Sequence, residues 1–333
     1  VKDLNVMNKN TIIAIVAIII ALAAPFMMYP VLLMKLLCFA LFACAFNLLI
    51  GYTGLLSFGH AAFLGGAGYI AGYVIRDLGL PFEIGIVAGV AFAAFIGLVM
   101  GSLAIRRQGI YFTMITLALA QMLYFIFLQA RFTGGEDGLQ GIPRGTLFGV
   151  VDLSNDLTLY YVVLAICIAG YALIVRTVHS PFGQVLKAIK ENEPRAISLG
   201  YDVDRYKLLV FVLSAALSGL AGATKATVLG FETLTDVHWT MSGLVVLMTL
   251  VGGLGTLAGP IVGAIVIIAL ENRIGEFGTW MAVTTNIDWF RSLGEQVTIV
   301  TGFIFIVVVL AFRKGIVGEI LAWNSRRLLK ADK

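Results

Sequence analysis

Long apolar runs constrain the fold of this chain more than any other feature of its sequence. Residues 11–29 and 297–312 are two examples, and neither contains a charged residue. A helix needs about 20 apolar residues, or slightly fewer, to cross the hydrocarbon core of a bilayer. Only 13% of the 333 residues are charged, whereas about a quarter are charged in a soluble domain. The sequence therefore predicts an all-α, polytopic bundle of transmembrane helices in a lipid bilayer.

About ten spans or half-spans can be placed along the chain. They are 11–29, 31–50, 59–75, 82–105, 110–130, 158–175, 208–229, 241–252, 260–270 and 297–312. The first has no small-residue cleavage site, so we expect a retained span. The pieces 241–252 and 260–270 are too short for simple spans and are separated by a Gly-rich stretch, 253–259. They are interpreted either as full spans or as half-helices that meet at a break inside the protein.

The charges of the loops predict the orientation of the bundle. Lys and Arg gather at 106–107, in 176–207 and in the tail, whereas 132–157, 230–240 and 271–295 are acidic. Cytoplasmic loops are the ones enriched in Lys and Arg. With ten crossings, every one of these loops falls on its expected side, and both termini lie inside.

This orientation divides the chain into three parts. We expect a cytoplasmic N-terminal segment at 1–10, a transmembrane domain at 11–312 and a cytoplasmic tail at 313–333. The longest cytoplasmic segment within the transmembrane domain is 179–207.

Segment 179–207 has the pattern of two short helices. Ser180 and Pro181 are typical of an N-cap and a first helical position. The following helix, 182–193, places apolar residues on one face, and Pro194 begins a second helix that stops at Gly200. One interpretation is a folded protrusion that another protein contacts and moves. A solvated loop whose charges only set the topology fits the pattern equally well.

Several stretches are similar to one transporter family. Residues 181–200 resemble the cytoplasmic coupling loop of the LivM-type permeases, which are membrane subunits of branched-chain amino acid ABC importers. Further similar stretches occur in order over about residues 30–320, at 47–60, 111–117, 133–139, 252–256 and 313–318. The resemblance implies a type II-like importer fold and a location in the bacterial inner membrane.

The resemblance also implies partners. A second, LivH-like permease would complete the pathway, two cytoplasmic ATPase subunits would hold ATP and Mg, and a periplasmic binding protein would deliver the solute. Branched-chain amino acids are the leading substrate, with urea, short amides or other small organic solutes as alternatives. The residues that would couple to the ATPases are Phe182, Gly183, Leu186, Ala188, Ile189, Glu191, Asn192, Ala196, Leu199 and Gly200.

The chain itself is expected to be a transport subunit rather than an enzyme, with no cofactor, metal or nucleic-acid partner. It contains no Gly-x-x-x-x-Gly-Lys-Ser/Thr sequence for nucleotide phosphates. The weaker Gly-x-Gly-x-x-Ala pattern at 66–71 and 253–258 has no βαβ setting, so we interpret it as helix packing or a helix break. Cys38, Cys44 and Cys167 are expected to be buried, small apolar residues.

Polar residues within apolar runs are candidates for the translocation path, because they are costly in hydrocarbon and often functional. The candidates are Asn47, Thr53, Ser57, His60, Thr113, Thr116, Gln121, Thr249, Gly253 and Gly255. For Ser and Thr, a hydrogen bond back to the same helix is the competing interpretation. Asn47 is predicted either to bind substrate or to bridge two helices, and His60 to be packed and hydrogen-bonded. Lys225, near the outer end of its span, is a further polar residue of this kind, and extension toward the membrane interface is the competing interpretation.

The breaks at 51–59 and 252–259 are the preferred lining elements. The ends of broken helices offer partial charges to a zwitterion without ionised side chains. An ion-coupled secondary transporter is the main competing class, but it would need ionisable residues near the membrane midplane, and the span centres have almost none. Signatures of a channel filter or a clustered catalytic set are not visible.

Overall fold

The computed structural model describes residues 16, 18–285, 302–303, 306 and 315–319. Within these residues, five helices are long and apolar enough to cross a membrane: α2 (Pro30–Thr53), α4 (Phe82–Ala104), α5 (Ile110–Gln129), α6 (Asp156–His179) and α9 (Val203–Leu229). The predicted all-α, multi-pass bundle is therefore confirmed.

Three further helices accompany these spans: α3 (His60–Arg76), α11 (Trp239–Gly252) and α12 (Gly259–Thr285). At a rise of about 1.5 Å per residue, α3 and α11 measure roughly 25 and 21 Å, less than the roughly 30 Å of a hydrocarbon core. Both are therefore shorter than a typical spanning helix, and the length of α11 agrees with the half-helix interpretation of 241–252.

The remaining described elements are short. They are η1 (Ala24–Phe26), η2 (Arg131–Thr133), η3 (Gly135–Asp137), α7 (Pro181–Glu191), α8 (Glu193–Ser198), α10 (Leu234–Val237), β1 (Leu139–Gln140), β2 (Thr146–Leu147), β3 (Val151–Asp152) and β4 (Phe231–Glu232). The strands form two small antiparallel pairs, β1 with β4 and β2 with β3.

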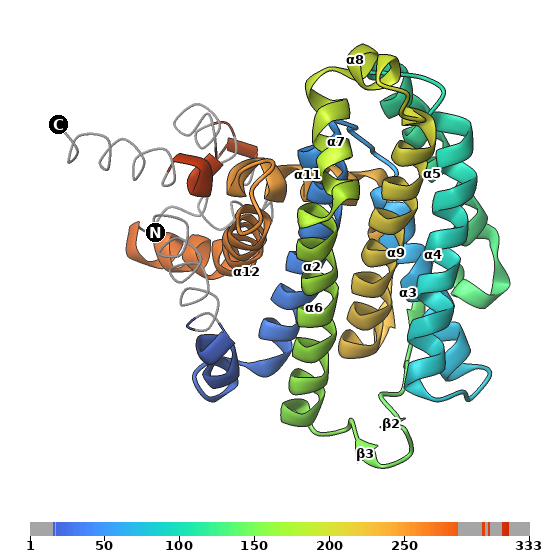
Figure 1. Cartoon of the computed structure of the whole chain (residues 1–333). Helices are drawn as coiled ribbons and strands as arrows, with labels where there is room; N and C mark the ends of the chain where they lie inside the picture. Colours follow the sequence, from blue (N-terminus) through green and yellow to red (C-terminus); the bar gives the residue numbers. More distant parts are fainter. Residues whose placement is uncertain (1–15, 17, 286–301, 304–305, 307–314, 320–333) are drawn as a thin grey trace.

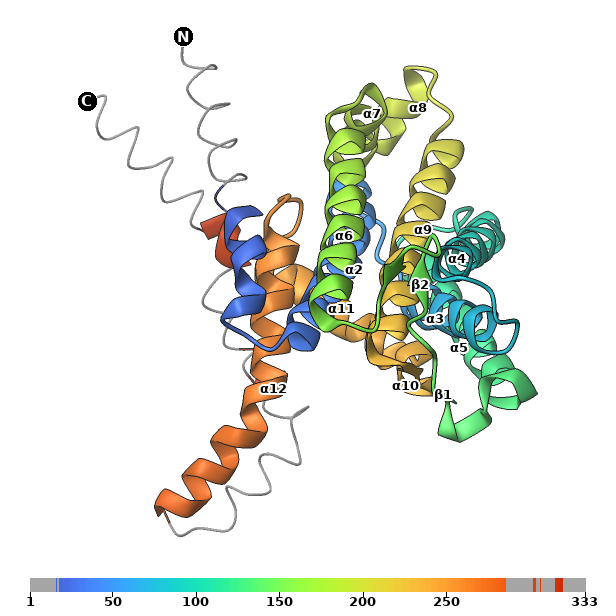
Figure 2. The same cartoon turned by 90° about the horizontal axis from the view of Figure 1, so that it is seen from below.

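Helix α9 lies at the centre of the bundle, packed against α2, α3 and α4. Helix α2 is apolar on all sides and largely buried, with Phe42 and Phe46 fully enclosed, as is typical of a helix inside a bundle. It connects the central group to α6, α11 and α12. Figure 1 accordingly shows α2 and α6 between α12 and the α4–α5 pair, and Figure 2 shows the far end of α12 leaning away from the rest.

The bundle has two distinct ends (Figure 1). At one, which we call the α8 end, the amide of Gln108 donates to Glu193 at 2.9 Å, so loop 105–109 meets α8. At the other, the hairpin end, the β2–β3 hairpin lies near β1 and β4, which join the loops after α5 and α9. The side of the membrane that each end faces stays a prediction.

The structure corrects the predicted start of the loop after segment 260–270. A loop beginning at residue 271 is wrong up to Thr285, because α12 continues through Glu271 and Asn272 as one helix of 27 residues. Glu is a good helix former, so its charge does not end a helix. Segment 260–270 is thus part of a long helix rather than a half-helix.

Segments 1–10, 297–312 and 313–333 lie outside the described residues, apart from 302–303, 306 and 315–319.

The three cysteines are buried, as expected from the apolar stretches in which they lie. The thiols of Cys38, Cys44 and Cys167 are free and buried in the apolar core. This confirms their interpretation as small apolar residues.

Candidate functional site

The α7–α8 segment begins with a tightly built corner after α6. The Ser180 hydroxyl accepts a hydrogen bond from the amide of Gly183 at 3.3 Å, and Pro181 occupies the first turn of α7. A Cβ on Gly183 would collide with the carbonyl oxygens of Thr177 and Val178. Gly183 is therefore needed for the corner itself.

The second helix of the segment starts at a side-chain cap. The Asn192 side chain accepts from the amide of Arg195 at 3.1 Å, and this cap begins α8. The two predicted short helices are both present, with boundaries within about two residues of those expected.

The predicted coupling residues divide into two faces. Gly183, Leu186, Ile189 and Ala196 are buried, and Phe182 stacks on Tyr206 with ring centroids 5.5 Å apart. The exposed members are Ala188, Glu191, Asn192, Leu199 and Gly200. Ile197, which the sequence analysis did not select, is 57% exposed, and Leu199 is 68% exposed. The buried face anchors the segment, and the exposed one presents apolar side chains beyond the bundle.

Lys190 joins α7 to the break after α2. Its Nζ donates to the carbonyl oxygen of Gly51 at 2.6 Å, in the last turn of α2, where helix carbonyls lack partners within the helix. A cation at this end of a helix is also favoured by the helix dipole. Lys190 was not among the predicted coupling residues, because it lies more than a hundred positions from Gly51 and no local pattern links the two.

The two predicted breaks, 51–59 and 252–259, meet through Asn47. Its side-chain amide donates to the carbonyl of Thr256 at 2.9 Å, and its side-chain oxygen accepts from the amide of Gly255 at 3.0 Å. Gly253 and Gly255 have φ angles of 122° and 73°, a region that favours glycine. Of the two roles considered for Asn47, the geometry shows the bridge between segments.

Two threonines of α5 hold the first break in place. Thr113 donates to the carbonyl of Leu56 at 2.9 Å, and Thr116 accepts from the amide of Phe58 at 3.3 Å. Ser57 accepts from the amide of Gly59 at 3.1 Å. These bonds satisfy backbone groups that the interrupted helix leaves open.

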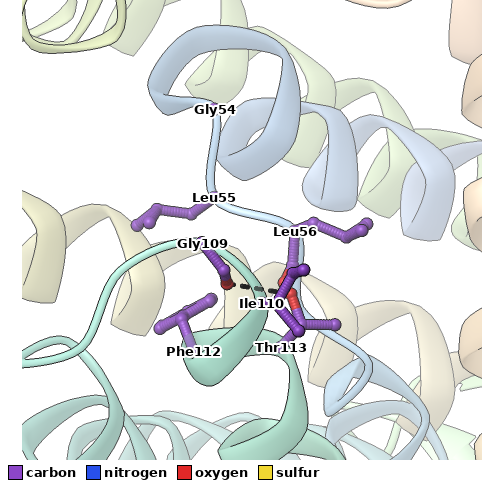
Figure 3. Close-up of a pocket in the computed structure, with 7 residues that line it drawn as sticks. All are labelled: Gly54, Leu55, Leu56, Gly109, Ile110, Phe112 and Thr113. Carbon is purple, nitrogen blue, oxygen red and sulfur yellow. Dashed lines mark hydrogen bonds between the residues drawn. The ribbon is translucent and has the colours of Figure 1, made fainter.

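A pocket of about 240 Å³ lies where this break meets the start of α5. Figure 3 shows the residues that line it: Gly54, Leu55, Leu56, Gly109, Ile110, Phe112 and Thr113. Of the candidate path residues, Thr113 is the one that contributes to this lining.

His60 is a packed residue in the centre of the bundle. Its Nε2 lies 2.8 Å from the Ser214 hydroxyl, which donates its own proton to the carbonyl of Ala45 at 2.6 Å. Ser214 must therefore accept from His60, so the ring proton resides on Nε2. The rings of Phe46, Phe63 and Phe211 meet the imidazole edge to face.

The remaining path candidates lie apart from this group. Thr53 and Thr249 donate back to Leu49 and Val245 of their own helices, at 2.5 and 2.8 Å. Gln121 is half-buried on α5. The structure thus brings Asn47, Gly253 and Gly255 together and places Ser57, Thr113 and Thr116 at the other break.

The interpretation that Lys225 extends to the interface is wrong. Lys225 is 2% exposed, and its Nζ lies 2.5 Å from Asp236 and 3.2 Å from Glu232. Glu232 is fully buried, and Asp236 also accepts from Thr233 at 2.8 Å. The two acids return to Lys225 because the chain after α9 folds back along α3, where Gly68 leaves room for the Glu232 carboxylate. We call Lys225, Glu232 and Asp236 the charged triad.

The chain matches a family of transport proteins over most of its length. The model of the family described as the permease component of branched-chain amino acid transport systems matches residues 28–311. The chain is 25% identical to the high-affinity branched-chain amino acid transport permease LivM of Escherichia coli, over 82% of this chain and 70% of that protein.

Permeases named for other solutes are also similar. The autoinducer 2 import permease LsrC of Klebsiella pneumoniae is 31% identical, over 54% of this chain and 50% of that protein. The ribose import permease RbsC of Bacillus subtilis is 26% identical, over 59% of this chain and 58% of that protein. With the family model covering so much of the bundle, the chain belongs to the family of branched-chain amino acid transport system permease components and is a multi-pass membrane transport protein.

Proposed function

We propose that this chain is one of two membrane subunits of an ATP-driven importer in the bacterial inner membrane. A second, LivH-like permease completes the translocation path, and a periplasmic binding protein delivers the solute. Two cytoplasmic ATPase subunits bind ATP and Mg and dock on the α7–α8 segment. Branched-chain amino acids, or a related small amino-acid-like solute, are the proposed cargo.

The observation that carries this proposal is the build of the α7–α8 segment. Its inner face is fastened to the bundle through Leu186, Ile189 and Ala196, and its outer face exposes Ile197 and Leu199. Exposed apolar side chains on a rigid element are typical of a docking surface. A loop that only set the topology would need neither the buried anchors nor the apolar tip.

The paired breaks support transport of a polar solute. Helices α2 and α11 both end at the α8 end, near Asn47, and the backbone between 252 and 259 is irregular. Irregular backbone at membrane depth is tolerated where it is enclosed by protein or lines a cavity. Helix ends there provide partial charges for a zwitterion.

A sugar-like solute is the second candidate for the cargo. The similarity to permeases named for ribose and autoinducer 2 import favours it. Urea and short amides are further alternatives. An ion-coupled secondary transporter is the competing class of mechanism.

Co-purification tests the assembly. The tagged chain is isolated gently from its native cells, and its partners are identified by mass spectrometry. The proposal expects two P-loop ATPases and a second permease in stoichiometric amounts. A chain that is recovered alone, or only with copies of itself, would remove the basis for ATP coupling.

Two substitutions sharpen this test. Leu199→Asp should reduce ATPase recovery and uptake by about tenfold or more, as expected for loss of an apolar anchor, with normal membrane insertion. The matched control is Val150→Asp, also an exposed apolar residue but at the hairpin end, and it should behave as wild type. Gly183→Asp is unsuitable, because the α6–α7 corner has no room for a side chain.

Uptake into proteoliposomes with the binding protein identifies the cargo. Leucine, ribose and urea are compared in the same vesicles. ATP-dependent uptake of leucine alone supports the amino-acid assignment, and uptake of ribose or urea assigns the cargo to that class instead.

A further inference from the structure

Three segments converge on one side chain at the α8 end. Lys190 reaches from α7 to the Gly51 carbonyl at 2.6 Å, and its stem lies beside Gly54, where α2 ends. Its Nζ also lies 4.0 Å from the position that a Cβ on Gly255 would occupy. From the element that the proposed function assigns to the ATPases, Lys190 therefore binds the first break and lies beside the second.

The break at 252–259 is linked to the same point from within the bundle. Asn47, one helical turn before Gly51, binds the backbone of Gly255 and Thr256. A Cβ on Gly51 would collide with the Gly255 amide, so these two backbones pack directly against each other. A displacement of α2's last turn therefore acts on 252–259 through this backbone contact and through the Asn47 side chain.

We propose that Lys190 is the positioning residue that transmits movement of the α7–α8 segment to both helix breaks. This inference rests on the proposed function. A charge-assisted hydrogen bond to a helix-end carbonyl is short and directional. When α7 shifts, this bond can move the last turn of α2 without unfolding it.

The other lysine of α7 provides a matched control. Lys187 lies one turn earlier and also faces α2, but its Nζ sits 5.9 Å from the Tyr52 ring centroid. Within the described part of the chain it makes no hydrogen bond to a carbonyl like that of Lys190. Methionine at either position keeps an apolar stem of similar length and removes the charge. Lys190→Arg retains a donor for the Gly51 carbonyl.

The experiment measures uptake and ATP hydrolysis in the same proteoliposomes of the assembled importer. Lys190→Met should lower the solute taken up per ATP hydrolysed by about tenfold, with assembly and basal hydrolysis unchanged. Lys187→Met should remain within about twofold of wild type, and Lys190→Arg should recover most of the ratio. A wild-type ratio in Lys190→Met, or loss of the ATPases from its complex, would overturn the inference.

A second measurement separates this inference from the proposed function. Hydrogen exchange on the purified chain requires no transport. Lys190→Met should accelerate amide exchange in peptides covering 51–59 and 253–258 and leave 60–76 unchanged, whereas Lys187→Met should change neither. Absence of ATP-dependent uptake in wild type would count against the importer, whereas unchanged exchange in Lys190→Met would count against the link.

Discussion

The two ends of the bundle are held together by different kinds of contact. At the α8 end, single hydrogen bonds to backbone groups connect α7, α2 and the 252–259 turn, with Lys190 and Asn47 as the donors. At the hairpin end, the charged triad is enclosed by protein, and β1 pairs with β4 beside it. The α8 end is thus connected by a few hydrogen bonds that can be exchanged for others. The hairpin end is connected by buried charges, which are costly to move apart in a nonpolar environment.

This difference assigns the two ends different mechanical roles. Separating buried charges leaves each of them unsolvated, which is far more costly than exchanging one backbone hydrogen bond for another. The hairpin end should therefore stay closed while the α8 end changes its contacts. Four substitutions test this comparison.

Lys225→Met should have the largest effect on stability. It removes the single cation of the charged triad, so Glu232 and Asp236 stay buried without the positive charge that they share. Breaking such a pair costs about 3–5 kcal/mol. Thermal unfolding of the purified chain in detergent should show a large loss of stability. A change within experimental error would contradict the view that the charged triad holds the hairpin end closed.

Asn47→Ala should have the next largest effect. It removes two hydrogen bonds to the backbone of Gly255 and Thr256 and leaves those groups unsatisfied, at a cost of about 1–3 kcal/mol each when buried. Limited proteolysis should show faster cleavage at 253–258. Equal cleavage of the variant and the wild type would show that the turn holds its shape without the bridge.

Lys207→Met should cost less than Lys225→Met, although both lysines are 2% exposed. Lys207 pairs at 2.6 Å with Glu193, whose side chain is 22% exposed and also accepts from Gln108. Water and Gln108 therefore still solvate the orphaned carboxylate, and the expected loss is about 1 kcal/mol. The same thermal unfolding assay compares the two variants. An equal loss of stability would show that the ion pairs at the two ends contribute equally.

Glu232→Gln should have the smallest effect at mildly acidic pH. Burial raises the pKa of Glu232 well above its usual value, while Lys225 acts in the opposite direction. A carboxyl whose pKa is higher in the folded than in the unfolded chain stabilises the fold at low pH, and this contribution is lost as pH rises. Gln imitates the protonated acid.

A pH series of unfolding curves checks this prediction. Wild type should lose stability from mildly acidic to mildly alkaline pH, and Glu232→Gln should lose less. Asp236→Asn is the control, because Asp236 forms the shorter contact to Lys225, and it should be destabilised throughout. Parallel pH profiles for wild type and Glu232→Gln would contradict a raised pKa of Glu232.

The sequence was a sufficient guide to elements that depend on local patterns. Apolar length predicted the spans, and the Ser180–Pro181 pair with Gly200 predicted the two helices between α6 and α9. These features follow from hydrophobicity and capping within a few residues. The resemblance to LivM-type permeases added the family, which the comparisons support.

Contacts between distant residues could not be predicted in the same way. Lys225 looked like an interfacial lysine because nothing in its own helix identifies Glu232 and Asp236 as partners. The acidic loop after it was used only to predict the orientation of the bundle. Asn47 and Lys190 likewise depend on how the chain returns to the α8 end. The end of α12 was misplaced for another reason, since charged residues marked a loop although Glu271 and Asn272 continue a helix.

The pairing of β1 with β4 also sets an order of assembly during synthesis. Helix α3 leaves the ribosome before either strand exists, and its Gly68 and Gly72 face the later residues Glu232, Leu139 and Ile142. Until these residues have been synthesised, that side of α3 lacks the neighbours that cover it in the complete fold. The packing around α3 is therefore complete only after α9 and the segment with Glu232 have been synthesised, so this half of the fold depends on residues made late.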